Sequence, residues 1–281
     1  MTIIKRRMVR ICKGLLFALI GVFGSLPAQA QDWVFATAPT QTPEKTIQMY
    51  QPIVDLLSKA TGHKIKLVPA KNFLEYTHGL RKDQYDIVFD GPHFVGWRMK
   101  NLKHKVVAKL PGQLRYSVIE NDSSGVKEVK RLAGLKVCSL ASPNLLTLGF
   151  LDQFGNPASQ PIIVSVPSFK ASLECVRSGQ ADAAIMRDKF WAKLPADQKK
   201  GMHLLYTSDT AFPHRAFSVS ERVDAKATEQ ILAALTSEEG ATAGKAVLQS
   251  FKAKKFLPAS AAEYEGLGRL LNPVWGFRKY K

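Results

Sequence analysis

Polar residues directly after a short apolar segment are the first candidates for binding a small solute. Residues 85–89 read as a buried strand, and it ends at Asp90 because the following Gly91-Pro92 cannot continue a strand ladder. In an open α/β sheet, ligands bind beyond the carboxyl ends of the strands. We therefore expect Asp90, Gly91 and His93 to face a cleft. The alternative roles are a helix cap for Asp90 and a surface position at the start of a helix for His93.

A second buried strand, residues 181–186, precedes Arg187, which is a candidate for binding an acidic group of a ligand. Pairing with Asp90 across the cleft, or another structural ion pair, is the alternative for Arg187. Thr40 lies in a hydroxyl-rich loop and is a candidate hydrogen-bond donor. Ser168 is a candidate ligand contact, and its alternative role is a helix cap. Tyr50 is a candidate to line the cleft with its ring, and its alternative is a core position.

The sequence contains none of the common catalytic motifs. It has no G-x-S-x-G, H-E-x-x-H, P-loop or C-x-x-C segment. The six histidines show no metal-ligand spacing. We expect no catalytic residue, no metal and no cofactor, and an enzyme on this scaffold is the distant alternative.

The N-terminus has the three parts of a secretory signal peptide. Five basic residues precede the apolar residues 15–23, and Ala28-Gln29-Ala30 is an A-x-A cleavage site. We expect residues 1–30 to be removed and the protein to be exported to the periplasm. Cleavage lowers the formal net charge of +17 by five, to +12. The remaining basic residues are scattered and match no nucleic-acid motif, so we interpret them as a generally basic, solvated surface that is compatible with steering of an anion, and we expect no binding of nucleic acid.

Two cysteines, Cys138 and Cys175, remain after cleavage. Export makes a disulfide between them chemically possible. Two buried thiols are an equally good interpretation, because sequence does not give the separation that a bridge requires. A metal site is a third and weaker alternative.

The order of strands and helices predicts an α/β protein with two lobes. Each half of the chain follows a β-α-β-α-β order, typical of a mostly parallel sheet with helices on both faces. We expect lobe 1 to comprise residues 31–120 and about 215–281, and lobe 2 to comprise residues 121–214. The expected strands are residues 33–38, 64–69, 85–89, 114–120, 135–140, 162–166, 181–186, 203–207 and 216–220.

Four segments in consistent order resemble one known family. These segments are similar to periplasmic substrate-binding proteins of phosphate, phosphite and phosphonate ABC transporters. They are Tyr50-x-Pro52 followed by Thr61-Gly62, QYDIVFDGP at 84–92, GLKV at 134–137 and SGQADAA at 178–184. The resemblance covers roughly residues 33 to 235. It implies the type II periplasmic-binding fold.

The resemblance also implies where the ligand binds. The family presents a Ser/Thr-rich turn at the start of a second-lobe helix, where hydroxyls and free N–H groups hold phosphonate oxygens. Here the matching segment begins at Ser142, and Leu145 and Leu146 replace donors, which leaves Asn144 and Thr147 as polar candidates. Phe94 resembles the family's cleft aromatic, with a core position as the alternative. Relatives often carry an apolar residue in place of Asp90 and an acidic one in place of Arg187.

The resemblance implies a function in transport. We expect a monomer that captures a small anionic or zwitterionic solute, phosphonate- or phosphate-like, by closing its lobes, and delivers it to an ABC permease in the inner membrane. A ligand-sensing module for a membrane signalling partner is the alternative.

Overall fold

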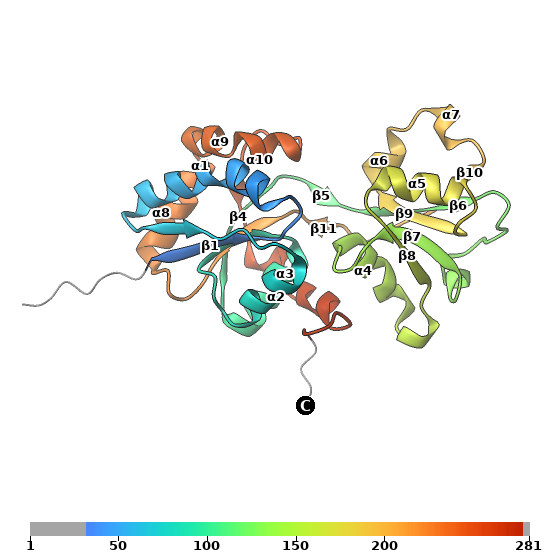
Figure 1. Cartoon of the computed structure of the whole chain (residues 1–281), viewed down its shortest axis with the longest axis horizontal. Coiled ribbons are helices and arrows are strands. Elements are labelled where there is room, and N and C mark those ends of the chain that lie inside the picture. Colours follow the sequence, from blue (N-terminus) through green and yellow to red (C-terminus); the bar gives the residue numbers. More distant parts are fainter. Residues whose placement is uncertain (1–31, 278–281) are drawn as a thin grey trace, which may run out of the picture. The chain divides into compact units, whose positions relative to one another are not determined.

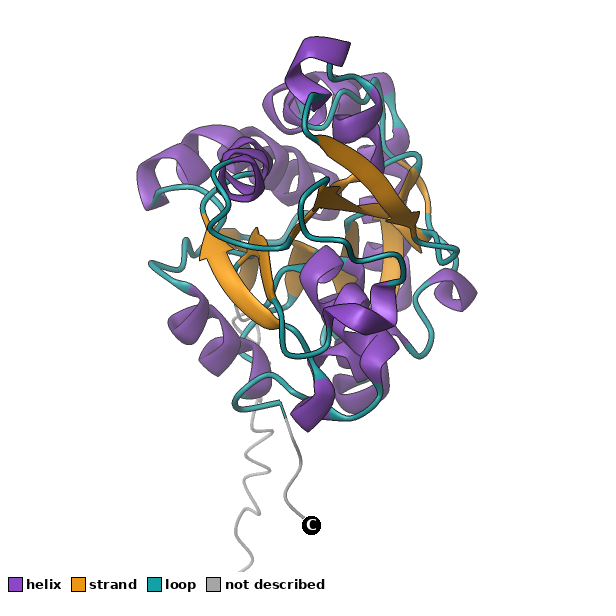
Figure 2. Cartoon of the chain, turned by 90° about the vertical axis from the view of Figure 1, so that its right-hand side faces the viewer, coloured by secondary structure: helices purple, strands orange, loops and turns teal. Residues whose placement is uncertain are grey.

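The computed structural model describes residues 32–277, so the expected signal peptide lies outside the described residues. These residues form two mixed sheets, with helices outside the strands of both (Figures 1 and 2). No described helix combines the length and the apolar character needed to cross a bilayer.

The first sheet has six strands in the order β13-β4-β12-β3-β1-β2. Strand β1 pairs in parallel with β2 and β3, and β12 pairs antiparallel to β3 and β4. Because β13 also runs antiparallel to β4, four of the six strands share one direction. The strands are β1 (Trp33–Thr37), β2 (Ile65–Leu67), β3 (Ile87–Asp90), β4 (Lys105–Lys109), β12 (Ala216–Val219) and β13 (Leu257–Pro258).

The second sheet has five strands in the order β10-β6-β9-β7-β8. Strand β7 pairs in parallel with β8 and β9, and β6 runs antiparallel to β9 and β10, so four of the five strands share one direction. Each sheet contains two parallel strand pairs and further antiparallel pairs, so the expected α/β fold is present and both of its sheets are mixed. The strands are β6 (Tyr116–Asn121), β7 (Lys136–Leu140), β8 (Ile162–Val166), β9 (Ala183–Arg187) and β10 (Met202–Thr207).

Two short strands carry the chain between the sheets. β5 (Gln113–Leu114) leads toward the second sheet, β11 (Phe212–Pro213) leads back, and they pair antiparallel. Strand β6 already belongs to the second sheet, although the expected boundary at residue 120 places its residues in lobe 1. The return to the first sheet at Ala216 lies close to the expected residue 215.

Helices cover the sheets because strand side chains alternate between faces. Phe35, Ile87 and Phe89 share a buried cluster with α1 and α8, whereas Ala36 and Val88 share one with α2. The helices associated with the first sheet are α1 (Pro43–Thr61), α2 (Phe73–Arg81), α3 (Pro92–Leu102), α8 (Ala225–Thr236), α9 (Glu238–Ala243) and α10 (Lys245–Ser250). Those associated with the second are α4 (Leu145–Leu151), α5 (Phe169–Arg177), α6 (Asp188–Ala192) and α7 (Ala196–Lys199).

The core of the second sheet contains a disulfide. Cys138 on β7 is bonded to Cys175 on α5, and their Cα atoms lie 6.3 Å apart, within the usual range for a bridge. The sequence left a disulfide, two buried thiols and a metal site as alternatives, and the structure has the disulfide.

Sequence reasoning missed strand β4, because a short apolar run between lysines carries little periodicity. A short 3-10 turn over Val129–Leu132 precedes β7.

Candidate functional site

A cavity of about 510 Å³ lies where the turn after β3 meets the turn after β7. Gly91, Pro92 and His93 line it from the first turn, and Pro143 and Asn144 line it from the second. Both turns follow the carboxyl ends of parallel strands, which is where open α/β sheets bind ligands.

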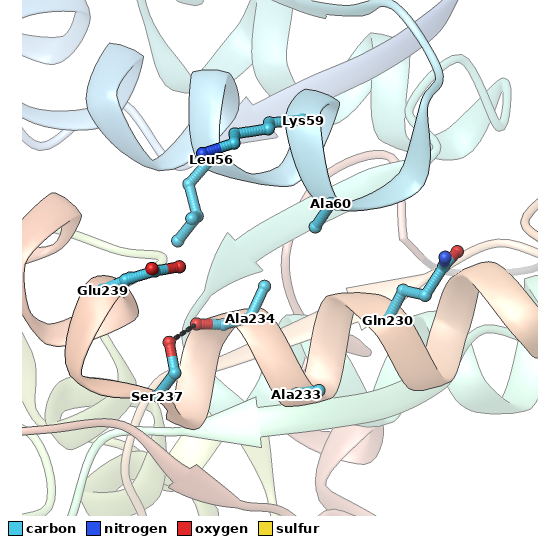
Figure 3. A pocket seen from close by; sticks show the side chains of 8 residues that line it. All are labelled: Leu56, Lys59, Ala60, Gln230, Ala233, Ala234, Ser237 and Glu239. Carbon is cyan, nitrogen blue, oxygen red and sulfur yellow. Dashed lines mark hydrogen bonds between the residues drawn. The ribbon is translucent and has the colours of Figure 1, made fainter.

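Another hollow, of about 390 Å³, lies between α1 and the helices α8 and α9 (Figure 3). Ala234 and Ser237 line it, and the Ser237 hydroxyl donates to the Ala234 carbonyl at 2.8 Å. None of its lining residues carries a buried polar atom that lacks a partner. No strand end reaches this hollow, so the cavity between the two turns is the candidate site.

Five of the nine residues predicted to bind ligand line that cavity: Thr40, His93, Phe94, Asn144 and Arg187. The other four, Tyr50, Asp90, Thr147 and Ser168, lie outside its lining, because each is engaged elsewhere.

Asp90, at the end of β3, forms a buried ion pair with Arg98 on α3. Arg98 donates from Nη1 and Nη2 to the two carboxylate oxygens, at 2.7 Å each. The Tyr76 hydroxyl also donates to Asp90, and Ser218 Oγ accepts from Arg98. The expected alternative of a pair between Asp90 and Arg187 is therefore wrong.

Burial alone would lower the pKa of Arg98, but the Asp90 carboxylate outweighs it and raises that pKa. Burial, followed by the Asp90 charge, raises the pKa of Tyr76 well above its ordinary value. The network is therefore an Asp90–Arg98 ion pair to which the neutral Tyr76 hydroxyl donates a hydrogen bond. It fixes Asp90, the residue directly before the turn that begins at Gly91.

Tyr50 is a core residue, with its ring centroid 6.0 Å from those of Phe35 and Phe89. Thr147 donates its hydroxyl to the Leu140 carbonyl at 2.7 Å, which fastens α4 to the end of β7. Ser168 accepts from the Ala171 amide at 3.1 Å and so caps α5.

Asn144 lines the cavity but also caps α4. Its side-chain oxygen accepts from the amides of Leu146 and Thr147 at 3.0 and 3.4 Å. The N-terminal donors that the resemblance assigns to phosphonate oxygens are thus already partly satisfied.

His93 bridges the two turns. Its Nε2 lies 2.9 Å from the Pro143 carbonyl oxygen. Burial lowers the pKa of His93 to about 4, and the Asp90 charge opposes this only in part. A neutral ring must donate through Nε2 to a carbonyl, so Nδ1 is an acceptor, and it is buried without a partner.

Gly91 is required for this arrangement. A Cβ at residue 91 would lie 2.7 Å from Cε1 of His93.

Two arginines provide unsatisfied donors at the cavity. Nε of Arg187, at the end of β9, and Nη1 of Arg215, just before β12, are buried and have no hydrogen-bond partner among the described residues. Arg187 and Arg215 are half-buried as whole residues, so each offers a buried N–H group that an anionic oxygen could accept from. None of the residues lining the cavity is Asp or Glu.

Sequence reasoning missed Arg215 and its neighbour His214, which also lines the cavity. The available signal was their position: they lie at the expected boundary between the lobes, directly before the strand expected at residues 216–220. His214 Nδ1 accepts from the Arg215 amide at 2.9 Å. Burial, and then the charges of Arg187 and Arg215, lower the pKa of His214 to about 3. His214 is therefore neutral near pH 7, with its proton on Nε2.

No group of three or more His, Cys, Asp or Glu side chains within residues 32–277 is arranged to hold a metal ion.

A family of known proteins matches most of this chain. The family described as "ABC transporter, phosphonate, periplasmic substrate-binding protein" matches residues 35–264. Its members are transport proteins and not enzymes.

A curated relative and two solved structures are similar to this chain. The phosphate-import protein PhnD of Mycolicibacterium smegmatis is 27% identical over 124 residues, which span 41% of this chain and 38% of that protein. PhnD1 of Prochlorococcus marinus, solved in complex with methylphosphonate, has a TM-score of 0.61 at 18% identity, covering 86% of this chain and 97% of that one. A Xanthomonas citri protein solved with ATP has a TM-score of 0.68 at 13% identity, covering 88% and 99%. At these identities the solved structures show the shared fold, the type II periplasmic-binding fold expected from the sequence.

Proposed function

The chain belongs to the family of periplasmic substrate-binding proteins of phosphonate ABC transporters, and from this premise we propose that it captures a small phosphonate or phosphate-like anion in the cavity between the two turns. The observation that carries the proposal is a pair of buried arginine nitrogens, on Arg187 and Arg215, that have no hydrogen-bond partner within residues 32–277. A tetrahedral oxyanion bound there would accept charge-assisted hydrogen bonds from both guanidinium groups.

The remaining wall favours an organic phosphonate over inorganic phosphate. Phe73, Phe94, Leu145, Leu146 and Phe169 give the cavity an apolar side, next to the cationic one. An alkyl or aryl group bonded to phosphorus gains free energy by leaving water against such a wall. Phosphate offers no such group. The proposal agrees with the ligands of two similar proteins: one is a phosphate-import protein, and the other was solved in complex with methylphosphonate.

The solute leaves unchanged in this proposal. The protein acts in the periplasm as a monomer, closes about the solute, and passes it to an ABC permease in the inner membrane. The family assignment favours transport over the alternative of a sensing module.

Titration calorimetry with methylphosphonate, phosphate and sulfate tests the proposal. We expect methylphosphonate to bind more tightly than phosphate. Arg187→Gln and Arg215→Gln should each weaken binding by about 10- to 100-fold, because a hydrogen bond to a charged group contributes about 1.5–3 kcal/mol. Arg131→Gln, at an exposed arginine that lines none of the described cavities, is the matched control.

The proposal fails if none of these anions binds the purified protein. It also fails if both arginine variants bind methylphosphonate as tightly as the Arg131→Gln control does.

A further inference from the structure

A second cavity, of about 410 Å³, adjoins the candidate site. The two share Arg187, His214 and Phe251 as lining residues. Beyond these shared residues the second cavity is lined by Lys189 from α6, by Lys193 directly after α6 and by Lys252 after α10. We call this second cavity, with Arg187 and the three lysines, the basic annex.

The lining of the basic annex contains cationic side chains and no acidic one. Neither Arg187 nor any of the three lysines takes part in a salt bridge within residues 32–277, although eleven other ion pairs occur there. Cations that line one cavity repel each other, and an anion bound among them reduces that repulsion.

The charges come from separate elements that meet at this place. Arg187 ends β9, Lys189 lies on α6 and Lys193 directly follows α6. Lys252 lies about sixty residues further along the chain. His214 between them is buried and neutral near pH 7, with Arg187, Arg215 and Lys189 all acting on it. The positive charge of the basic annex is thus carried by Arg187 and the lysines, and it extends the cationic side of the candidate site outward.

We propose that the basic annex binds a second anionic group, so that the preferred solute is a phosphonate whose organic substituent ends in an acidic group. The inference rests on the proposed function, because the phosphonate head must occupy the candidate site. Arg187, which lines both cavities, lies between the two anionic ends. Lys189, Lys193 and Lys252 provide the surrounding field for the distal group.

The three lysines are exposed, which limits the size of the effect. Exposed charges interact weakly and are screened by salt. We expect the distal charge to change affinity by about 3- to 10-fold at low ionic strength. The difference should shrink when the salt concentration rises above about 0.3 M.

Three phosphonates of matched length provide the test: 3-phosphonopropionate, propylphosphonate and 2-aminoethylphosphonate. They end in a carboxylate, a methyl group and an ammonium group. Titration calorimetry of the mature protein at low salt should give the order carboxylate, then methyl, then ammonium, from tightest to weakest. Propylphosphonate reports on the candidate site alone.

The double variant Lys189→Met/Lys193→Met identifies the residues responsible. It should reduce the preference for 3-phosphonopropionate over propylphosphonate to about twofold or less, and leave propylphosphonate affinity close to that of the natural protein. Lys200→Met, at an exposed lysine outside both cavities, is the control and should keep the full preference.

The outcomes separate the two proposals. If none of the three compounds binds, the proposed function itself fails. If all three bind and the carboxylate gives no advantage, or if the double variant keeps the advantage, the assignment of the basic annex is overturned while the proposed function stands. Tightest binding of 2-aminoethylphosphonate would overturn it as well.

Discussion

The two turns that meet at the cavity look alike in sequence and differ in how their polar groups are used. Each follows the end of a buried parallel strand, contains a proline and leads into a helix. After β3, the carboxylate of Asp90 is paired with Arg98, and α3 begins without a side-chain cap. After β7, Asn144 caps α4, and β7 is also joined to α5 by the disulfide.

The difference shows that a polar residue at a strand end can serve the scaffold instead of the ligand. Asp90 stabilises the first turn through its buried pair with Arg98. Asn144, a residue of the cavity wall, stabilises the second turn by capping α4. Among the described residues that line the cavity, the buried polar atoms without a protein partner are on Arg187, Arg215 and His93, and His93 joins one turn to the other. Three variants test this division of roles.

Arg98→Met should have the largest effect. It leaves the Asp90 carboxylate buried without its cation, and breaking a buried pair in this way costs about 3–5 kcal/mol of unfolding free energy. Urea denaturation followed by circular dichroism measures the loss. Arg269→Met is the control: its pair with Asp152 is exposed, so it should cost about 1 kcal/mol or less.

Arg98→Met could also show that the comparison is wrong. A variant as stable as the natural protein that no longer binds methylphosphonate would place Asp90 in the binding site and not in the scaffold.

His93→Gln should change the response of stability to acid by a smaller amount. Because burial lowers the pKa of His93 from 6.5 to about 4, only the unfolded chain protonates at this residue between those values. The native state therefore loses stability as pH falls below about 6.5, by about 2 kcal/mol at pH 5 from this residue. Above pH 6.5 this contribution to stability is fully present.

The measurement is a set of urea denaturation curves between pH 7.5 and pH 4.5. His93→Gln should lose less stability toward acid than the natural protein does. His78→Gln, at an exposed histidine, serves as control and should follow the natural profile. Parallel profiles for all three proteins would contradict a buried, neutral His93.

Asn144→Ala should have the smallest effect. Loss of an N-cap costs about 1 kcal/mol, and Asp224→Ala, which removes the cap of α8 far from the cavity lining, should cost about the same. Thermal denaturation compares the two. Affinity of Asn144→Ala for methylphosphonate should fall much less than that of Arg187→Gln. An equal fall with unchanged stability would make Asn144 a ligand contact.

Much of the architecture followed from patterns that act over short distances. Apolar segments of strand length and the Gly91-Pro92 break predicted the β-α-β-α-β order of both halves, and Ser168 caps α5 as one of its two predicted roles required. These patterns are readable because a strand or a helix start depends mainly on a few neighbouring residues.

Side-chain partners were not readable from the sequence, because they join residues far apart along the chain. Ser218 reaches Arg98 across 120 residues, and Arg222 reaches Asp86 across 136. Whether Asp90 faced a ligand or a cation depended on such contacts, as did the pairing of Cys138 with Cys175 and the arrival of Arg215 opposite Arg187. The sequence by itself determined the elements and the edge of the sheet where a solute belongs. Only the tertiary structure decided which polar groups remain free to bind it, because a buried donor is satisfied or left open by neighbours that folding alone brings together.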